Sequence, residues 1–72
     1  MSKLPVLKPR EILQILKKVG FIEVRTRGSH LQLKKGNLLV TVPIHDHDLS
    51  LETLKSILRQ ARISSKELQD LL

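Results

Sequence analysis

The residues of this chain best suited to chemistry form one short segment, Arg27-Gly28-Ser29-His30. Histidine has an unperturbed pKa of about 6.5, so it can both accept and donate a proton near neutral pH. A base that removes a 2′-hydroxyl proton, with cations that stabilise the crowded phosphorane, can cut RNA without a metal. His30 is therefore a candidate catalytic residue. The alternative is an ordinary histidine on a strand surface.

A second group of capable side chains is the run His45-Asp46-His47-Asp48. Imidazole and carboxylate groups can ligate zinc or manganese. The His-x-His spacing lacks a third ligand at a recognisable distance, so we expect no metal site. We interpret this run as a polar loop that contacts a partner.

The charge balance points toward a polyanionic partner. The chain has 13 Lys and Arg against 7 Asp and Glu, a net charge of +6, which favours nucleic acid over other partners. A merely solvated surface is the alternative. Phe21 is the one aromatic residue besides the histidines, so the base stacking used by many single-strand readers is excluded. Bound nucleic acid would be held by its phosphates and its shape.

Length and composition limit the remaining possibilities. Seventy-two residues are one domain, in which residues 1–8 are a loose N-terminal lead-in. The absence of cysteine excludes disulfides and thiolate metal sites. The N-terminus lacks the apolar core of a signal peptide, and the apolar run Leu38–Val42 is too short to span a bilayer. We expect a cytoplasmic protein with no membrane segment and no small-molecule cofactor.

Helical and alternating patterns follow one another along the chain. A helix is predicted over Pro9–Val19, from a stripe of apolar residues at helical spacing. Alternating strands follow over Phe21–Arg27, His30–Lys35 and Leu38–Val42. They are joined by the two-residue loops Gly28-Ser29 and Gly36-Asn37, and the first of these suits a type II′ turn.

Two-residue loops fix a register, and the register fixes two faces. The predicted pairs across the first loop are Arg27–His30, Arg25–Gln32 and Glu23–Lys34. Across the second loop they are Lys34–Leu39, Leu33–Val40 and Gln32–Thr41. The outer face then collects Arg25, Arg27, His30, Gln32, Lys34 and Thr41. The inner, apolar face collects Ile22, Val24, Leu31, Leu33, Leu38, Val40 and Val42. One apolar face requires helices on one side of the sheet.

A second helix is predicted over Leu51–Ala61, with Ser50 as its N-cap and with apolar residues, Leu51 among them, that face the sheet. A short C-terminal helix begins at the capping box Ser64-x-x-Glu67. The fold class is therefore α+β: helix, three-stranded antiparallel sheet, helix and short C-terminal helix. This arrangement is like that of double-stranded-RNA-binding domains, with both main helices on one sheet face.

Three segments carry a family resemblance. Gly28-Ser29-His30-Leu31, Val42-Pro43-Ile44-His45 and the run from Thr53 to Ala61 are similar in order and spacing to the HicA family of toxins. The resemblance covers about Pro9 to Leu68. The chain departs from the family at Glu52 and at Arg62, where glycine is common.

The resemblance implies a specific activity. HicA toxins are mRNA interferases that need no metal, and the histidine of the Gly-Ser-His segment, here His30, is their catalytic residue. A HicB antitoxin covers this face and holds the toxin inactive. For this chain we expect mRNA and a HicB-like antitoxin as partners. The residues expected to bind RNA are Arg25, Arg27, Ser29, Gln32 and Lys34. Two alternatives stay open, a non-catalytic RNA-binding module and a purely protein-interaction domain.

Overall fold

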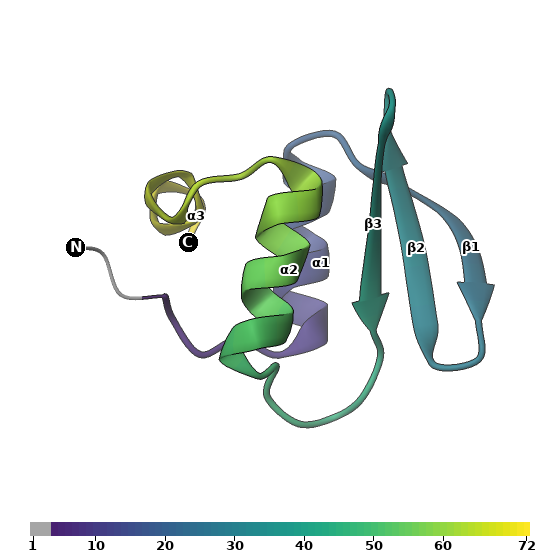
Figure 1. Ribbon diagram of the computed structural model, residues 1–72, viewed down its shortest axis with the longest axis horizontal. Coiled ribbons are helices and arrows are strands. Elements are labelled where there is room, and N and C mark those ends of the chain that lie inside the picture. The colour runs from purple at the N-terminus through teal and green to yellow at the C-terminus, as the bar shows by residue number, and fades with distance from the viewer. Residues whose placement is uncertain (1–3) are drawn as a thin grey trace.

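The computed structural model describes residues 4–72, and within them one sheet is covered by helices on one side (Figure 1). The elements in chain order are α1 (Pro9–Lys18), β1 (Ile22–Arg27), β2 (His30–Lys35), β3 (Leu38–Pro43), α2 (Leu51–Ala61) and α3 (Ser65–Leu71). The predicted α+β arrangement is confirmed, and four of its element boundaries differ by one residue. Residues 1–3 of the predicted lead-in lie outside the described residues.

The helices begin where the sequence supplies acceptors for their free N–H groups. The Ser50 side chain accepts the Thr53 N–H at 3.2 Å, as predicted for the start of α2. Ser64 and Glu67 form the predicted capping box of α3: each side chain accepts the other residue's N–H, both at 3.1 Å. At α1 the Glu11 carboxylate accepts the Lys8 N–H at 2.8 Å.

The core lies between the inner face of the sheet and the two long helices. Its fully buried residues come from every layer: Ile12, Leu16, Leu33, Val40, Val42, Leu54, Ile57 and Leu68. Among the described residues no polar or charged residue is buried. The groups that could do chemistry therefore all lie at the surface.

The sheet order is β1-β2-β3, with both pairs antiparallel. Both hairpin glycines have φ of +57°, and neither following residue has a positive φ, which is the pattern of a type II′ turn. The register confirms every predicted pair but one: Arg27–His30, Arg25–Gln32, Lys34–Leu39, Leu33–Val40 and Gln32–Thr41.

The predicted pairing of Glu23 with Lys34 is wrong, because β1 contains a bulge. The ladder shifts between Glu23 and Arg25, which leaves Val24 as an extra residue, and Glu23 lies opposite Leu33. Since side chains alternate along a strand, a shift of one residue moves the first part of β1 to the opposite face. Glu23 consequently points to the helix side, where its carboxylate pairs with Lys17 of α1.

The prediction that Ile22 and Val24 line the inner face is also wrong. Their exposed fractions are 65% and 49%. The bulge places Ile22 opposite Lys34, and the extensive packing of β1 is with β2, beyond the helix layer (Figure 1). Leu51, predicted to face the sheet, is 54% exposed because it stands at the first position of α2, ahead of the buried Leu54.

The end of the lead-in is attached to the fold. Leu7 is buried in the core, and its carbonyl accepts the Leu49 N–H at 2.8 Å. This bond ties the chain before α1 to the loop before α2. The start of α1 is thereby fixed beside the loop that follows β3.

Candidate nucleic-acid interface

The outer face of the sheet consists of three cross-strand rows, given by the register. From the β1–β2 turn onward they are Arg27–His30–Pro43, Arg25–Gln32–Thr41 and Ile22–Lys34–Leu39. Residues directly opposite one another have Cβ atoms about 5 Å apart, and successive rows are about 7 Å apart along the strands. The structure therefore brings the predicted residues Arg25, Arg27, His30, Gln32 and Lys34 onto one continuous surface.

His30 is held at the first position of β2 by its neighbours in the chain. Gly28 supplies the positive φ that the turn needs. The Ser29 carbonyl accepts the Ile44 N–H at 2.6 Å, which extends the β2–β3 ladder one residue past the end of β3. In this pattern His30 and Pro43 form a non-hydrogen-bonded pair, so the N–H that proline lacks is not needed. The His30 side chain stands on a rigid strand end, exposed to solvent.

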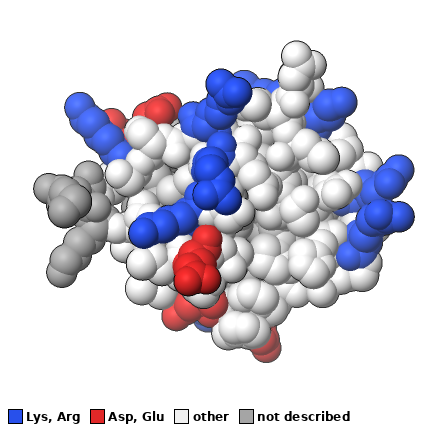
Figure 2. All heavy atoms as spheres, in the orientation of Figure 1, with Lys and Arg blue, Asp and Glu red and all other residues white. Residues whose placement is uncertain are grey.

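The cations of the outer face are not paired with acidic side chains in the described part of the chain. The bulge turns Glu23 to the other face, where Lys17 holds it, and within residues 4–72 Arg25, Arg27 and Lys34 form no ion pair. Figure 2 shows Lys and Arg side chains at the sheet end of the molecule, with the visible Asp and Glu side chains away from it. The surface around His30 is thus free to attract an anion.

Two apolar side chains also lie on this face. The sequence predicted Ile22 on the inner face and did not assign Leu39 to either face. Ile22 and Leu39 flank Lys34 in the third row, with exposed fractions of 65% and 49%. The alternation of β3 could have indicated Leu39, since its neighbours Leu38 and Val40 were assigned as inner residues. The bulge that exposes Ile22 left no clear signal in the sequence.

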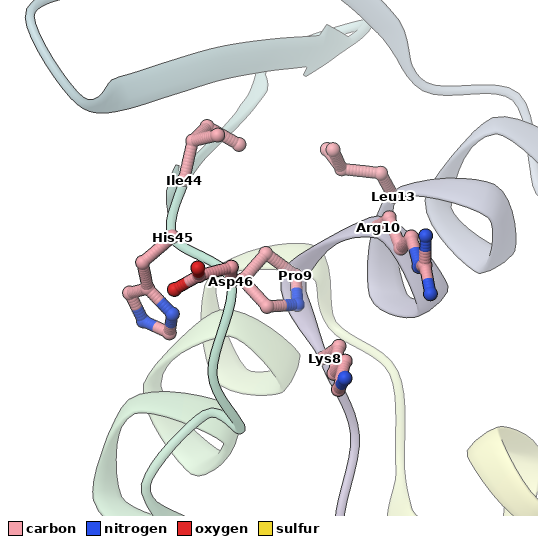
Figure 3. A pocket seen from close by; sticks show the side chains of 7 residues that line it. All are labelled: Lys8, Pro9, Arg10, Leu13, Ile44, His45 and Asp46. Atoms are coloured by element: carbon pink, nitrogen blue, oxygen red, sulfur yellow. The ribbon is translucent and has the colours of Figure 1, made fainter.

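One residue past Pro43 of the first row, where the chain leaves β3, Ile44 forms part of the wall of a hollow of about 280 Å³ (Figure 3). It is lined by residues around the start of α1 and by the loop after β3: Lys8, Pro9, Arg10, Leu13, Ile44, His45 and Asp46. Sequence reasoning missed this site, because its two sides are more than 30 positions apart in the chain. The fold joins them through the bond between Leu7 and Leu49.

The His45–Asp48 run forms no metal cluster in the structure. The rings of His45 and His47 stack with centroids 3.7 Å apart and planes 9° apart, and Asp46 lies 3.7 Å from His47. Within residues 4–72 no group of three or more His, Asp or Glu side chains is placed to hold a metal ion.

The matching family model is described as the HicA toxin of bacterial toxin–antitoxin, and it covers residues 9–63 of the 72. The chain belongs to the HicA toxin family. The matched range runs from the first residue of α1 to the residue that follows α2, so it includes the whole sheet and all three rows. As a HicA family member the protein is a toxin whose partner is an antitoxin.

A comparison with curated proteins finds no match. In residues 4–72 every helix is too short or too polar to cross a membrane.

Proposed function

We propose that this toxin is an endoribonuclease that cuts mRNA without a metal, with His30 as its catalytic residue. Its RNA-binding residues are then Arg25, Arg27, Ser29, Gln32 and Lys34. One observation carries the proposal: in a chain of a toxin family, His30 is exposed beside Arg27 on a face whose cations form no ion pair within the described residues.

The chemistry requires one proton acceptor and nearby positive charge. His30 takes the proton of an RNA 2′-hydroxyl, whose oxygen attacks the adjacent phosphorus. The new O2′–P bond forms as the P–O5′ bond breaks, which leaves a 2′,3′-cyclic phosphate. The departing O5′ takes a proton from the imidazolium or from water. Arg27, in the same row, stabilises the phosphorane charge, since a preorganised cation acts most strongly where charge develops.

The second and third rows support RNA binding. Arg25 and Gln32 lie about 7 Å further along the sheet, within reach of the neighbouring phosphate and sugar. Lys34 adds a third cation beyond them, between Ile22 and Leu39. Ser29 lies in the turn next to His30, where its hydroxyl is exposed. Such contacts position an RNA strand without reading its bases.

The test is the rate at which purified protein cleaves a labelled RNA in the presence of chelator. His30→Ala should lower the rate about 10²–10⁴-fold, the usual contribution of a general base. Its free energy of unfolding should change by less than about 0.5 kcal/mol, because the side chain is exposed. Asn37→Ala, at the exposed second loop position of the other hairpin, is the matched control and should cleave normally.

Three outcomes would contradict the proposal. Undiminished cleavage by His30→Ala would remove the catalytic role of His30. Wild-type protein that binds RNA with steep salt dependence yet never shortens it would be an RNA-binding module. Protein that does not bind RNA but binds an acidic partner tightly would be a protein-interaction domain.

The substrate offers a second test of the mechanism. Replacing the 2′-hydroxyl at the cleavage site by hydrogen should stop cleavage and leave binding intact.

We further propose that a HicB-like antitoxin inhibits the toxin by covering the outer face. The third row supports this, because Ile22 and Leu39 expose apolar surface on both sides of Lys34. A partner with apolar and acidic side chains would match that surface. Ile22→Glu should therefore weaken antitoxin binding more than it weakens RNA cleavage.

Because the proposed substrate is mRNA, we also propose that the toxin acts in the cytoplasm.

A further inference from the structure

We propose that the hollow past the end of β3 is a nucleotide subsite: it binds the base and phosphate of a single-stranded RNA nucleotide next to the bond that is cut. The inference rests on the proposed ribonuclease function. It assigns a role to Lys8, Arg10 and His45, none of which belongs to the outer face.

The position of the hollow links it to His30. Ile44 is part of its wall, and the Ile44 N–H donates to the carbonyl of Ser29, the residue before His30. His30 itself lies opposite Pro43, the residue before Ile44. An RNA strand that passes His30 and continues around the end of β3 is therefore led toward the hollow.

The lining has the chemistry of a nucleotide. Leu13 and Ile44 provide apolar surface, and Figure 3 shows their side chains pointing toward each other from opposite walls. This suits the flat faces of a base. Lys8 and Arg10 are exposed cations at the α1 side, which suits a phosphate. The main-chain N–H of Lys8 donates to the Glu11 carboxylate and is not available to a phosphate. The positive charge for a phosphate therefore comes from the Lys8 and Arg10 side chains.

His45 adds a group suited to base recognition. Phe21 is buried, as an exclusion of base stacking on this chain requires, but that exclusion set the histidines aside. The imidazoles of His45 and His47 stack on each other and offer a flat aromatic surface of the kind that RNA-binding proteins commonly use. The Nδ1 atom of His45 is shielded and has no hydrogen-bond partner among the described residues. Because this nitrogen is shielded, a bound base would contact the rest of the His45 ring. Asp46, the acid in the lining, lies beside His47.

The size of the hollow limits its occupant. At about 280 Å³ it is slightly smaller than the ligand pockets of proteins, which span roughly 300–1,000 Å³. One base fits such a space, whereas a duplex does not. A single-stranded substrate is accordingly the class that we infer.

The first experiment measures kcat/KM on mixed-sequence RNA oligonucleotides that differ by one nucleotide in length. For wild-type protein one added nucleotide should raise kcat/KM about tenfold, as a well-placed contact does. The double variant Lys8→Ala/Arg10→Ala should lose that gain and still cleave the shorter substrate at the wild-type rate. The control Lys55→Ala/Lys66→Ala removes the same charge from other exposed positions and should keep the gain. Persistence of the gain in Lys8→Ala/Arg10→Ala, or its loss in both variants, would overturn the inference.

The second experiment needs no cleavage. His30→Ala protein is titrated with the same oligonucleotides carrying 2′-hydrogen, and the ring resonances of His45 are followed by NMR. These resonances should shift on addition of RNA. The shift should vanish when the His30→Ala protein also carries Lys8→Ala and Arg10→Ala. If the resonances shift but the wild-type protein does not cleave RNA, the subsite proposal stands and the proposed ribonuclease function is wrong. Cleavage without shifts, or shifts produced by the antitoxin and never by RNA, would reject the subsite alone.

Discussion

The two edge strands of the sheet differ in almost every physical respect. All six residues of β1 are exposed, and its extensive packing is with β2. In β3 Val40 and Val42 are fully buried, and both long helices contact the strand. The comparison shows that β3 stabilises the fold, whereas β1 carries charge with little part in the core.

The open edges of these strands differ as well. An edge strand presents unpaired N–H groups that can recruit another chain. On β3 the Thr41 N–H donates to Oε1 of Gln60 on α2 at 3.0 Å, and the Gln60 amide is oriented by a 3.3 Å bond to Ser56. On β1 the bulge at Val24 interrupts the edge. One edge is occupied by a helix side chain and the other is made irregular.

The largest expected difference between the strands is in stability. Val40→Ala should lower the free energy of unfolding by about 2–3 kcal/mol, because it removes two buried methyl groups and leaves a cavity. Val24→Ala makes the same chemical change at a half-exposed position of β1 and should cost less than about 0.5 kcal/mol. Urea unfolding followed by circular dichroism measures both. Equal losses would show that β1 shares the core and would break the comparison.

A smaller effect is expected at the β3 edge. Gln60→Ala frees the Thr41 N–H and should cost about 1 kcal/mol, partly offset by the better helix propensity of alanine. Amide hydrogen exchange at Thr41 should accelerate. Gln60→Glu keeps an acceptor oxygen and should preserve the protection of Thr41. Unchanged exchange in Gln60→Ala would mean that α2 does not guard this edge.

The smallest effect is expected at the end of α2, the helix that packs on β3. Arg62 is the one described non-glycine residue with a positive φ, at φ 57° and ψ 42°. Arg62→Gly should raise the free energy of unfolding by about 0.5–1 kcal/mol, because glycine adopts this conformation without strain. Arg62→Ala removes the same charge but retains Cβ, so it should give no such gain. Thermal unfolding distinguishes the two, at about 4–8 °C per kcal/mol for a domain of this size.

Sequence patterns were sufficient wherever local chemistry determined the structure. Ser50, Ser64 and Glu67 cap helices in the structure as their types and spacing predict. The glycine-led turns fixed the register near each hairpin, and this placed His30 beside Arg27. Position 62, where the resemblance led us to expect glycine, adopts a left-handed conformation, which is the backbone geometry that glycine favours.

Features that depend on distant parts of the chain could not be predicted from local patterns. The alternation from Ile22 to Thr26 is compatible with a regular strand, so the bulge at Val24 was missed together with its effect on Glu23. The hollow was missed because its walls, around Arg10 and Ile44, meet only in the folded protein. The roles assigned to His30 and to the hollow remain predictions for the experiments above.

The bulge at Val24 also bears on how the chain tolerates changes in length. It separates β1 into two parts, one that continues from α1 and one that faces Gln32 and His30. A residue inserted or deleted before Val24 would alter which side chain stands at position 22 or 23. Arg25 and Arg27 would keep their partners, because the turn at Gly28 sets their alignment. The proposed reaction surface is thus insulated from insertions and deletions in the connection that precedes it.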